Sequence, residues 1–259
     1  MSDMKISVFT VCFNSAATIR CTLDSFFAQE YSNKELIIVD GGSLDDTLKI
    51  ISTYPSEQMT LISEPDKGMY DALNKAMKLY TGDAFGLLNS DDRYASNSVL
   101  SKVAVALEAA DMVHGNLEFV TAHFENRADK QVIRRWKAID RPPMGFNSGW
   151  MPAHPTFYVK REVAEKTGEF SLDYSTASDY DWMLRAIELN DFSLTKLDYM
   201  MVEMLEGGKS TRNIKAKITH NLEALKSRRK WLDAGLLDYA LFAKPMRKIN
   251  QFFPAMKGQ

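Results

Sequence analysis

The first 90 residues alternate between short apolar runs and longer amphipathic stretches. The apolar runs are rich in β-branched and aromatic side chains, which predicts buried strands over 5–13, 35–39, 59–63 and 84–88. Capping residues and apolar positions at helical spacing predict helices over 16–29, 44–54 and 69–80. Strands that alternate with helices are typical of βαβ units. The sequence therefore predicts an α/β fold with a Rossmann-like, mostly parallel central sheet flanked by helices.

The remaining sequence is less regular and divides near residue 207. We expect strands over 111–120, 131–137, 154–160 and 192–204, and a helix over 178–190. Gly207 and Gly208 mark a boundary, because paired glycines interrupt regular structure. The expected organisation is a domain over 1–206, with halves of about 1–110 and 111–206, followed by a helical C-terminal extension over 207–259.

The net charge of −2 hides an uneven distribution of charged residues. Residues 209–259 contain 12 Lys and Arg but only three Asp and Glu, whereas residues 1–208 contain 20 Lys and Arg against 31 Asp and Glu. An acidic body with a basic tail predicts that the tail meets an anionic surface. Because proteins that read nucleic acids usually have a basic body, we expect no nucleic-acid partner.

Composition and motifs exclude several classes of protein. The chain is 45% apolar and 25% charged, as in ordinary globular domains, and its two cysteines cannot form a disulfide framework. It has no dinucleotide fingerprint after the first strand, no phosphate-binding P-loop and no nucleophile elbow. We find no signal peptide and no apolar run long enough to span a membrane, so we expect a cytoplasmic protein.

Polar residues follow three of the predicted strands directly. Asn14, Asp40 and Asp91 each lie just past the carboxyl end of a strand. Ligands of open α/β sheets bind at this edge. We therefore expect these residues to converge on one binding site.

The segment Asn89-Ser90-Asp91-Asp92 contains adjacent carboxylates at that edge. Such carboxylates repel one another, and a hard divalent cation such as Mg²⁺ or Mn²⁺ with oxygen ligands removes the repulsion. The alternative is an ordinary helix cap with a solvated carboxylate.

Two further segments have the features of a nucleotide site. Asp66, Lys67 and Gly68 lie at the predicted start of a helix, where an anion such as phosphate is favoured. In Asp40-Gly41-Gly42-Ser43, the carboxylate can accept hydrogen bonds from a base or ribose, and the glycines permit close approach. A polar helix face and a tight turn are the corresponding structural alternatives.

A fourth segment, Ala177 to Arg185, has carboxylates near the start of a predicted helix. Asp179 or Asp181 can supply a general base, although carboxylates at this position are also commonly structural.

Taken together and in this order, the motifs resemble family 2 glycosyltransferases of the GT-A fold, especially bacterial enzymes that build surface polysaccharides. The resemblance covers roughly residues 4–205. It is carried by 6–14, 39–47, 64–72, 88–92, 154–157 and 177–181.

The resemblance implies an inverting transfer of a hexosyl or N-acetylhexosaminyl group from a nucleotide sugar, with a UDP-sugar favoured. It places the nucleotide in the first half and a saccharide or lipid-linked saccharide acceptor in the second. The donor-binding residues that it implies are Thr10, Phe13, Asn14, Asp40, Asp66, Lys67, Gly68, Asn89 and Asp92. By the same resemblance, Asp91 ligates Mg²⁺ or Mn²⁺ and Asp179 is the base. His154 or Asp181 then contacts the acceptor or the diphosphate.

The sequence departs from the family pattern at two positions. Asn89 stands where the metal motif often has Asp, and Ser178 stands where the base motif often has Glu. These departures support an alternative function, a non-catalytic glycan- or nucleotide-binding subunit of a polysaccharide-assembly complex. A nucleotidyltransferase is disfavoured because no glycine-rich loop follows the first strand.

The basic tail is open to more than one interpretation. Met246, Ile249 and Phe253 share a helical face, and Arg228-Arg229-Lys230 precede them. A basic, aromatic, amphipathic segment fits an anionic membrane surface, which predicts peripheral binding to the cytoplasmic face of the inner membrane. Docking on the body and a contact in an oligomer are the alternatives.

Overall fold

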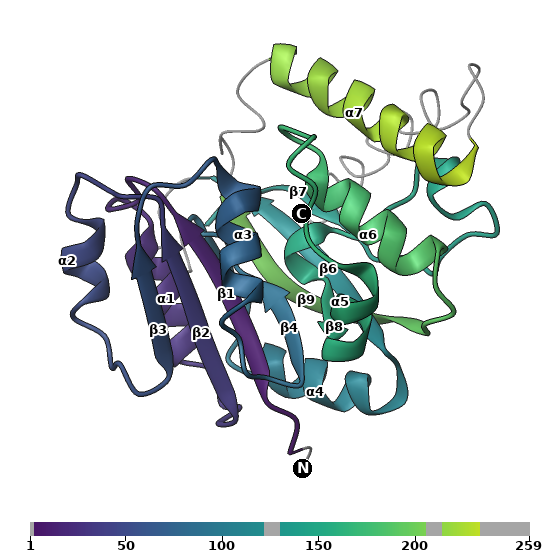
Figure 1. Cartoon of the computed structure of the whole chain (residues 1–259). Helices are drawn as coiled ribbons and strands as arrows, with labels where there is room; N and C mark the ends of the chain where they lie inside the picture. Colours follow the sequence, from purple (N-terminus) through teal and green to yellow (C-terminus); the bar gives the residue numbers. More distant parts are fainter. Residues whose placement is uncertain (1–2, 122–129, 206–213, 234–259) are drawn as a thin grey trace.

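The computed structural model of the chain describes residues 3–121, 130–205 and 214–233 (Figure 1). Its strands are β1 (Ile6–Cys12), β2 (Lys34–Asp40), β3 (Met59–Ser63), β4 (Ala84–Leu87), β5 (Asp92–Tyr94), β6 (Met112–Val120), β7 (Val132–Trp136), β8 (Tyr158–Lys160) and β9 (Leu194–Leu205). Its α-helices are α1 (Ile19–Phe27), α2 (Thr47–Ile51), α3 (Met69–Met77), α4 (Val99–Ala109), α5 (Arg161–Thr167), α6 (Ser178–Glu188) and α7 (Ile214–Leu232). Two 3-10 helices are η2 (Gly145–Ser148) and η3 (His154–Thr156).

One sheet runs through the molecule in the order β3-β2-β1-β4-β8-β6-β9-β5, and β7 pairs with β6. Strands β1, β2, β3 and β4 are parallel, as the alternation of strands and helices predicts. Strand β8 runs antiparallel to both of its neighbours, β4 and β6. Strand β5 pairs antiparallel with β9, and β7 pairs antiparallel with β6. Strands β6 and β9 pair in parallel, so the second half of the chain combines parallel and antiparallel pairs and makes the sheet mixed.

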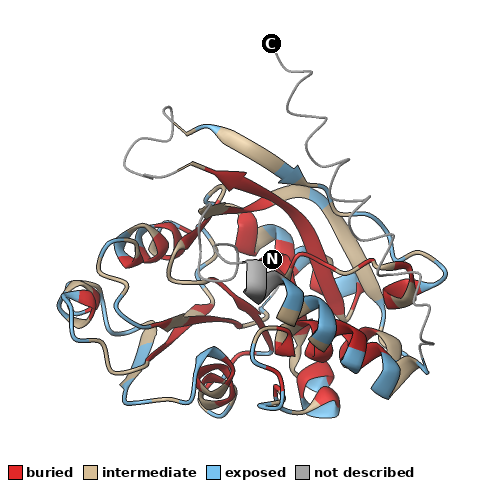
Figure 2. Cartoon of the chain, turned by 90° about the horizontal axis from the view of Figure 1, so that it is seen from above, coloured by how far each residue is buried: buried red, intermediate tan, exposed pale blue. Residues whose placement is uncertain are grey.

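Helices cover both faces of this sheet, as predicted. Along β1, Val8 faces one apolar cluster and Phe9 faces the other, because successive side chains of a strand point to opposite faces. Helices α3, α5 and α6 contribute to the cluster around Phe9, and α1 and α4 contribute to the cluster around Val8. Figure 2 shows the central strands and the inner sides of these helices as buried, whereas β3 and β7 are partly exposed.

The prediction of one continuous strand over 154–160 is wrong. The chain instead forms η3 and the short strand β8. The hydroxyl group of Thr156 contacts the carbonyl oxygens of Ala153 at 2.8 Å and Gly115 at 3.1 Å, which fixes a turn where apolar patterning indicated extended backbone.

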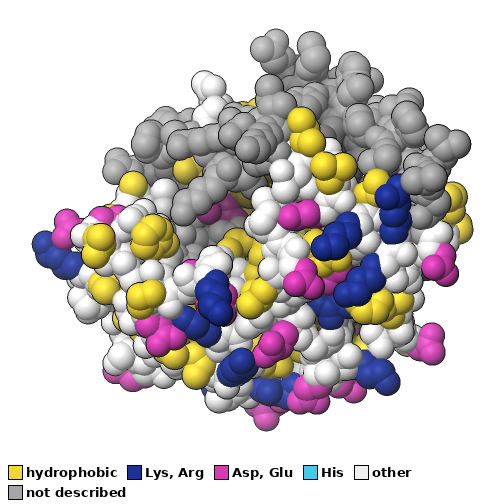
Figure 3. Space-filling view, turned by 45° about the horizontal axis from the view of Figure 1, so that its top comes forward, with side chains coloured by type: hydrophobic (Ala, Val, Ile, Leu, Met, Phe, Trp, Pro, Cys, Tyr) yellow, Lys and Arg dark blue, Asp and Glu magenta, His cyan; other side chains and the backbone are white. Residues whose placement is uncertain are grey.

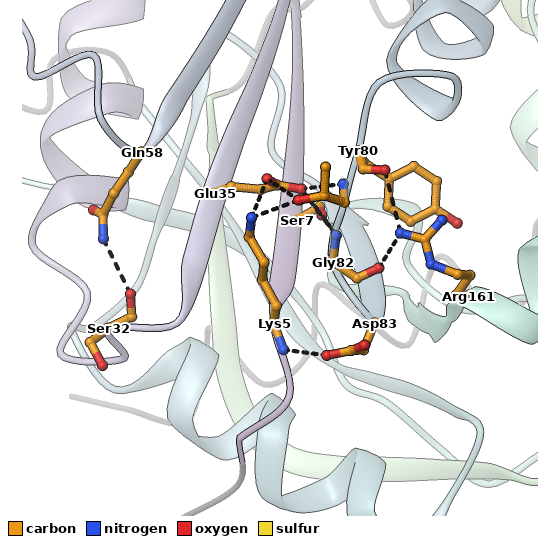
Figure 4. A network of polar contacts seen from close by, with 10 residues as sticks. Lys5, Ser7, Ser32, Glu35, Gln58, Tyr80, Gly82, Asp83 and Arg161 are labelled. Atoms are coloured by element: carbon orange, nitrogen blue, oxygen red, sulfur yellow. Dashed lines mark hydrogen bonds and ion pairs between the residues drawn. The ribbon is translucent and has the colours of Figure 1, made fainter.

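A polar network closes the edge of the sheet at the amino ends of the strands (Figure 4). Its centre is Glu35, whose carboxylate accepts hydrogen bonds from Ser7 Oγ at 2.6 Å and Thr81 N at 2.6 Å and pairs with Lys5 Nζ at 2.7 Å. Burial alone would raise the pKa of Glu35, but these partners outweigh burial and lower it to about 2. The network ties β1, β2 and the start of β4 together.

We expect Glu35→Gln to lower the free energy of unfolding by about 2–3 kcal/mol at pH 7, because the ionised carboxylate is stabilised in the folded state. The lowered pKa means that this contribution is present above the ordinary Glu pKa of 4.5 and is lost as pH falls toward about 2. Urea unfolding from pH 7 to pH 2.5 should therefore show a flatter acid dependence for the variant. Equal stability of the two proteins at pH 7 would contradict this role.

Helix α7 packs on α6 and forms the described part of the C-terminal extension (Figure 1). The Asp181 carboxylate of α6 accepts hydrogen bonds from Ser227 Oγ at 2.8 Å and Trp231 Nε1 at 2.9 Å. Arg228 is buried and donates to the Tyr180 hydroxyl at 2.7 Å. This part of the extension is therefore docked on the body, and the predicted segment over 236–259 lies outside the described residues.

The uneven charge along the sequence does not produce an evenly acidic face. On the face seen in Figure 3, Lys and Arg side chains lie among Asp and Glu side chains. Within the described residues, the helices are too short or too polar to span a bilayer.

Candidate active site

The loops after β1 and β4 meet at the carboxyl edge of the sheet, as predicted. Thr10 is buried and donates from Oγ1 to the Leu88 carbonyl oxygen at 2.8 Å. The hydroxyl oxygens of Ser15 and Ser90 lie 3.0 Å apart. Thr10 therefore holds the two loops together in this structure.

Asp40 organises the turn that follows β2. Its buried carboxylate accepts hydrogen bonds from Ser43 N at 2.9 Å, Ser63 Oγ at 2.8 Å and Gly42 N at 3.1 Å, and also from the Ser43 hydroxyl. Burial would raise the pKa of this carboxyl, but the hydrogen bonds from Ser43 and Ser63 lower it below its ordinary value. Asp40 is thus an ionised anchor of the glycine turn, and this turn borders the site.

Asn14 connects the first two loops. Its backbone has a positive φ of 50°, a conformation that Asn tolerates better than most residues. The Asn14 N–H donates to Ser43 Oγ at 2.8 Å, and Asn14 Oδ1 accepts from Leu44 N at 2.9 Å. The Ser43 hydroxyl group therefore links the loop after β2 to the loop after β1. Helix α2 begins at Thr47 rather than at the predicted residue 44, with Asp46 at its cap position.

Phe13, Gly41 and Asp66 lie side by side on the rim although they come from three separate loops. A methyl group at Gly41 would lie 2.6 Å from Asp66 Oδ2 and 3.5 Å from the Phe13 ring, so a larger residue there would require the Asp66 carboxylate to move. The Phe13 side chain is 47% exposed. An exposed aromatic ring beside a close-packed backbone provides a flat apolar surface for a ligand.

The loop before α3 is held by its own carboxylates. Asp66 Oδ1 accepts from Gly68 N at 2.7 Å, and Asp71 Oδ2 accepts from Lys67 N at 3.0 Å. These two backbone donors are therefore occupied. The Lys67 side chain is exposed. Lys75 pairs with Glu64 at 2.7 Å, as expected for an ordinary polar helix face.

The two adjacent carboxylates after β4 have different surroundings. Asp91 is partly exposed in the rim loop, whereas Asp92 is fully buried and accepts from Asn89 Nδ2 at 2.7 Å. Burial and the charge of Asp91 raise the pKa of Asp92 well above its ordinary value. Only Asp91 of this pair is therefore presented as a carboxylate at the rim.

No group of three His, Cys, Asp or Glu side chains with metal-binding geometry occurs within residues 3–121, 130–205 and 214–233. The donor set at the rim fits a hard cation that takes one carboxylate and completes its shell with substrate phosphate oxygens. It does not fit a cation that is enclosed by protein ligands alone.

Asp179 joins the two halves of the site. It lies in the first turn of α6 and is partly exposed, with 17% of its side chain accessible. Asp179 Oδ1 accepts a hydrogen bond from the Tyr70 hydroxyl at 3.1 Å, and Asp179 Oδ2 lies 3.4 Å from His154 Nδ1. Burial lowers the pKa of His154 although the nearby Asp179 opposes this, so the imidazole is neutral at pH 7.

The structure places Asp181 away from Asp179. Asp181 is 1% exposed and, besides its two contacts with α7, accepts from Arg185 Nε at 2.9 Å. These contacts assign it to the packing of α6 on α7. Sequence reasoning missed Tyr70, because the helical pattern put Met69 on the buried face, whereas Met69 is 42% exposed and Tyr70 is 7% exposed.

The fold is the one found in glycosyltransferases of the GT-A class. Solved GT-A glycosyltransferases share the fold. The mannosyltransferase PcManGT from Pyrobaculum calidifontis, solved with GDP-Man and Mn²⁺, matches with a TM-score of 0.66 and 18% identity over 98% of this chain and 74% of that chain. TarS residues 1–349 from S. aureus, solved with UDP-GlcNAc, match with a TM-score of 0.66 and 15% identity over 97% of this chain and 79% of that chain.

Sequence comparison identifies the family. Residues 7–168 match the sequence model of the family described as "Glycosyl transferase family 2". The chain belongs to this family and is a glycosyltransferase. A PGL/p-HBAD biosynthesis glycosyltransferase of Mycobacterium bovis is 27% identical to it over 209 residues, which is 78% of this chain and 77% of that protein.

Proposed function

We propose that this glycosyltransferase moves a sugar with inversion from a nucleotide-sugar donor, with UDP-sugars favoured, to a saccharide or lipid-linked saccharide of the cell surface. The observation that carries the proposal is the position of Asp179, where Tyr70 from the first half and His154 from the second contact one carboxylate. The ligands of the two solved GT-A enzymes support a nucleotide-sugar donor. Transfer from a panel of nucleotide sugars tests it.

In this mechanism one side chain performs the proton transfer. The Asp179 carboxylate accepts the proton of the acceptor hydroxyl as its oxygen attacks the anomeric carbon, and the bond from that carbon to the diphosphate breaks on the opposite side. No covalent sugar intermediate is needed, so a second carboxylate nucleophile is not required. The neutral His154 beside Asp179 contributes no competing positive charge.

Negative charge develops on the departing diphosphate and requires stabilisation. Lys67 provides an exposed ammonium group at the start of α3, and we assign it to the diphosphate. In this proposal the Phe13 ring contacts the nucleobase of the donor, and Asp40 holds the turn against which the nucleoside lies. A divalent cation at Asp91, when bound, supplies further positive charge to the diphosphate.

We propose that α7, the described part of the C-terminal extension, binds the membrane surface. The outer side of α7 exposes Ile218 and Leu222 together with Lys226, Arg229 and Lys230. Exposed apolar and basic side chains on one helix can bind an anionic lipid surface. Arg228 is not part of this surface, because it faces Tyr180.

We expect the protein to float with vesicles that contain phosphatidylglycerol, and we expect the double variant Leu222→Glu, Arg229→Glu to lose most of this binding. Each replacement puts a negative charge where the lipid surface is negative. Lys49→Glu on α2 is a matched control that should float like the wild type. Equal flotation of the double variant would contradict a role for α7.

A further inference from the structure

Tyr70 is a buried tyrosine whose hydroxyl group ends at the proposed base. It lies in the first turn of α3, close in sequence to Lys67, and donates to Asp179 Oδ1 at 3.1 Å. The contact joins residues 109 positions apart. It therefore connects the helix that begins at the donor side of the rim with the helix that carries the base.

The ring of Tyr70 is held from its other side. It stacks on Phe170 with ring centroids 6.3 Å apart and an interplanar angle of 17°. Phe170 is fixed by Asn74, one turn further along α3, through Asn74 Nδ2 to Phe170 O at 2.9 Å and Phe170 N to Asn74 Oδ1 at 2.8 Å. The hydroxyl group is consequently aimed at Asp179 by packing that does not involve Asp179.

The direction of the hydrogen bond follows from the surroundings. Burial, and then the charge of Asp179, raise the pKa of Tyr70 far above its ordinary value, so the phenol keeps its proton. The phenol therefore donates and the carboxylate accepts. A donor bonded to the ionised form of a carboxyl stabilises that form.

We propose that Tyr70 is a positioning residue, which holds one carboxylate oxygen of Asp179 in place while the acceptor hydroxyl approaches. This inference rests on the proposed function. Tyr70 does not touch the reacting atoms, and it acts through Asp179. Because Lys67 lies in the loop that immediately precedes α3, one short segment carries both the group assigned to the diphosphate and the residue that orients Asp179.

The test compares Tyr70→Phe with Tyr80→Phe. Tyr70→Phe keeps the ring that packs on Phe170 and removes only the hydroxyl group. Tyr80→Phe is the matched control, because Tyr80 is also buried and packs on Phe9 and Phe85 away from Asp179. Thermal unfolding of both variants establishes that they fold.

We expect two changes in Tyr70→Phe that the control does not show. The carboxyl ¹³C signal of Asp179, assigned by its absence in Asp179→Asn, should shift at neutral pH, because one carboxylate oxygen loses its hydrogen-bond donor. At neutral pH, kcat should fall about tenfold, while the donor KM changes less than twofold.

An unchanged Asp179 carboxyl signal in folded Tyr70→Phe would overturn the positioning role, even if the rate fell. The NMR measurement needs no substrate, so this result does not depend on the donor. Retention of full transfer by Asp179→Asn would instead overturn the proposed base, whatever Tyr70→Phe does. The two failures are therefore distinguishable.

Discussion

Asp179→Asn is expected to lower the transfer turnover by at least about 100-fold, while nucleotide-sugar binding persists. An amide cannot accept the acceptor's proton, and a positioned general base typically contributes 100-fold to 10,000-fold. The amide has nearly the same shape as the carboxylate, so the contacts of Tyr70 and His154 should still hold α6 in place. Initial rates together with calorimetric titration of the donor measure the two effects separately.

Asp191→Asn provides the matched control for this prediction. Asp191 is exposed just beyond the other end of α6, so it experiences the same substitution without access to the rim. Its rate should equal that of the wild type. A turnover within threefold of the wild type in Asp179→Asn would contradict the assignment of the base.

Asp91→Ala is expected to lower transfer by about 100-fold to 1,000-fold, and EDTA should abolish transfer by the unaltered protein. The reason is that only Asp91 of the adjacent pair is accessible at the rim, where it is partly exposed, and loss of a group that stabilises transition-state charge costs this much. Added Mn²⁺ or Mg²⁺ should restore the EDTA-treated wild type but not the variant. Calorimetric titration with Mn²⁺ in the presence of nucleoside diphosphate gives a readout that is independent of turnover.

Asp46→Ala is the control for the loss of an acidic side chain near the rim. Asp46 is exposed and pairs only weakly with Lys49, at 3.8 Å. It should respond to EDTA and Mn²⁺ like the wild type. Full activity of the wild type in EDTA would remove the metal from the mechanism.

The parallel half of the fold was predictable because its strands carry their own signal. Val8, Phe9, Ile37 and Ile38 are buried on both faces of the sheet, and such strands read as continuous apolar runs. The polar residues at their carboxyl ends then had to lie on one rim. Pattern reasoning alone did not select Asp179 as the catalytic base, because a carboxylate at the start of a helix is also commonly structural. The family resemblance was needed for that assignment.

The rest of the fold depends on contacts between distant residues. Strand β5 contains Asp92 and Arg93, which no apolar pattern would mark as buried. Arg93 is buried because Glu203 of β9 pairs with it at 2.5 Å, and the sequence does not reveal that pairing. Helices α4 and α5 and strand β5 were missed.

The individual carboxylates show the same limit. Asp181 and Asp179 are two residues apart, yet one faces α7 and the other faces Tyr70 and His154. The position of α7 decides between them, and α7 belongs to a segment that sequence patterning treated as separate from the domain. Likewise, the hydrogen bond from Ser63 to Asp40 comes from β3, whose position beside β2 no local pattern encodes.

The most direct test of the central claim is the anomeric configuration of the transfer product. The purified protein is incubated with a panel of nucleotide sugars, Mn²⁺ and saccharide acceptors, and the anomeric proton of the product is observed by ¹H NMR. A mechanism with one base and no nucleophile predicts release of nucleoside diphosphate and a product whose configuration is opposite to that of the donor. A product with the donor's configuration, or consumption of no donor, would contradict the account.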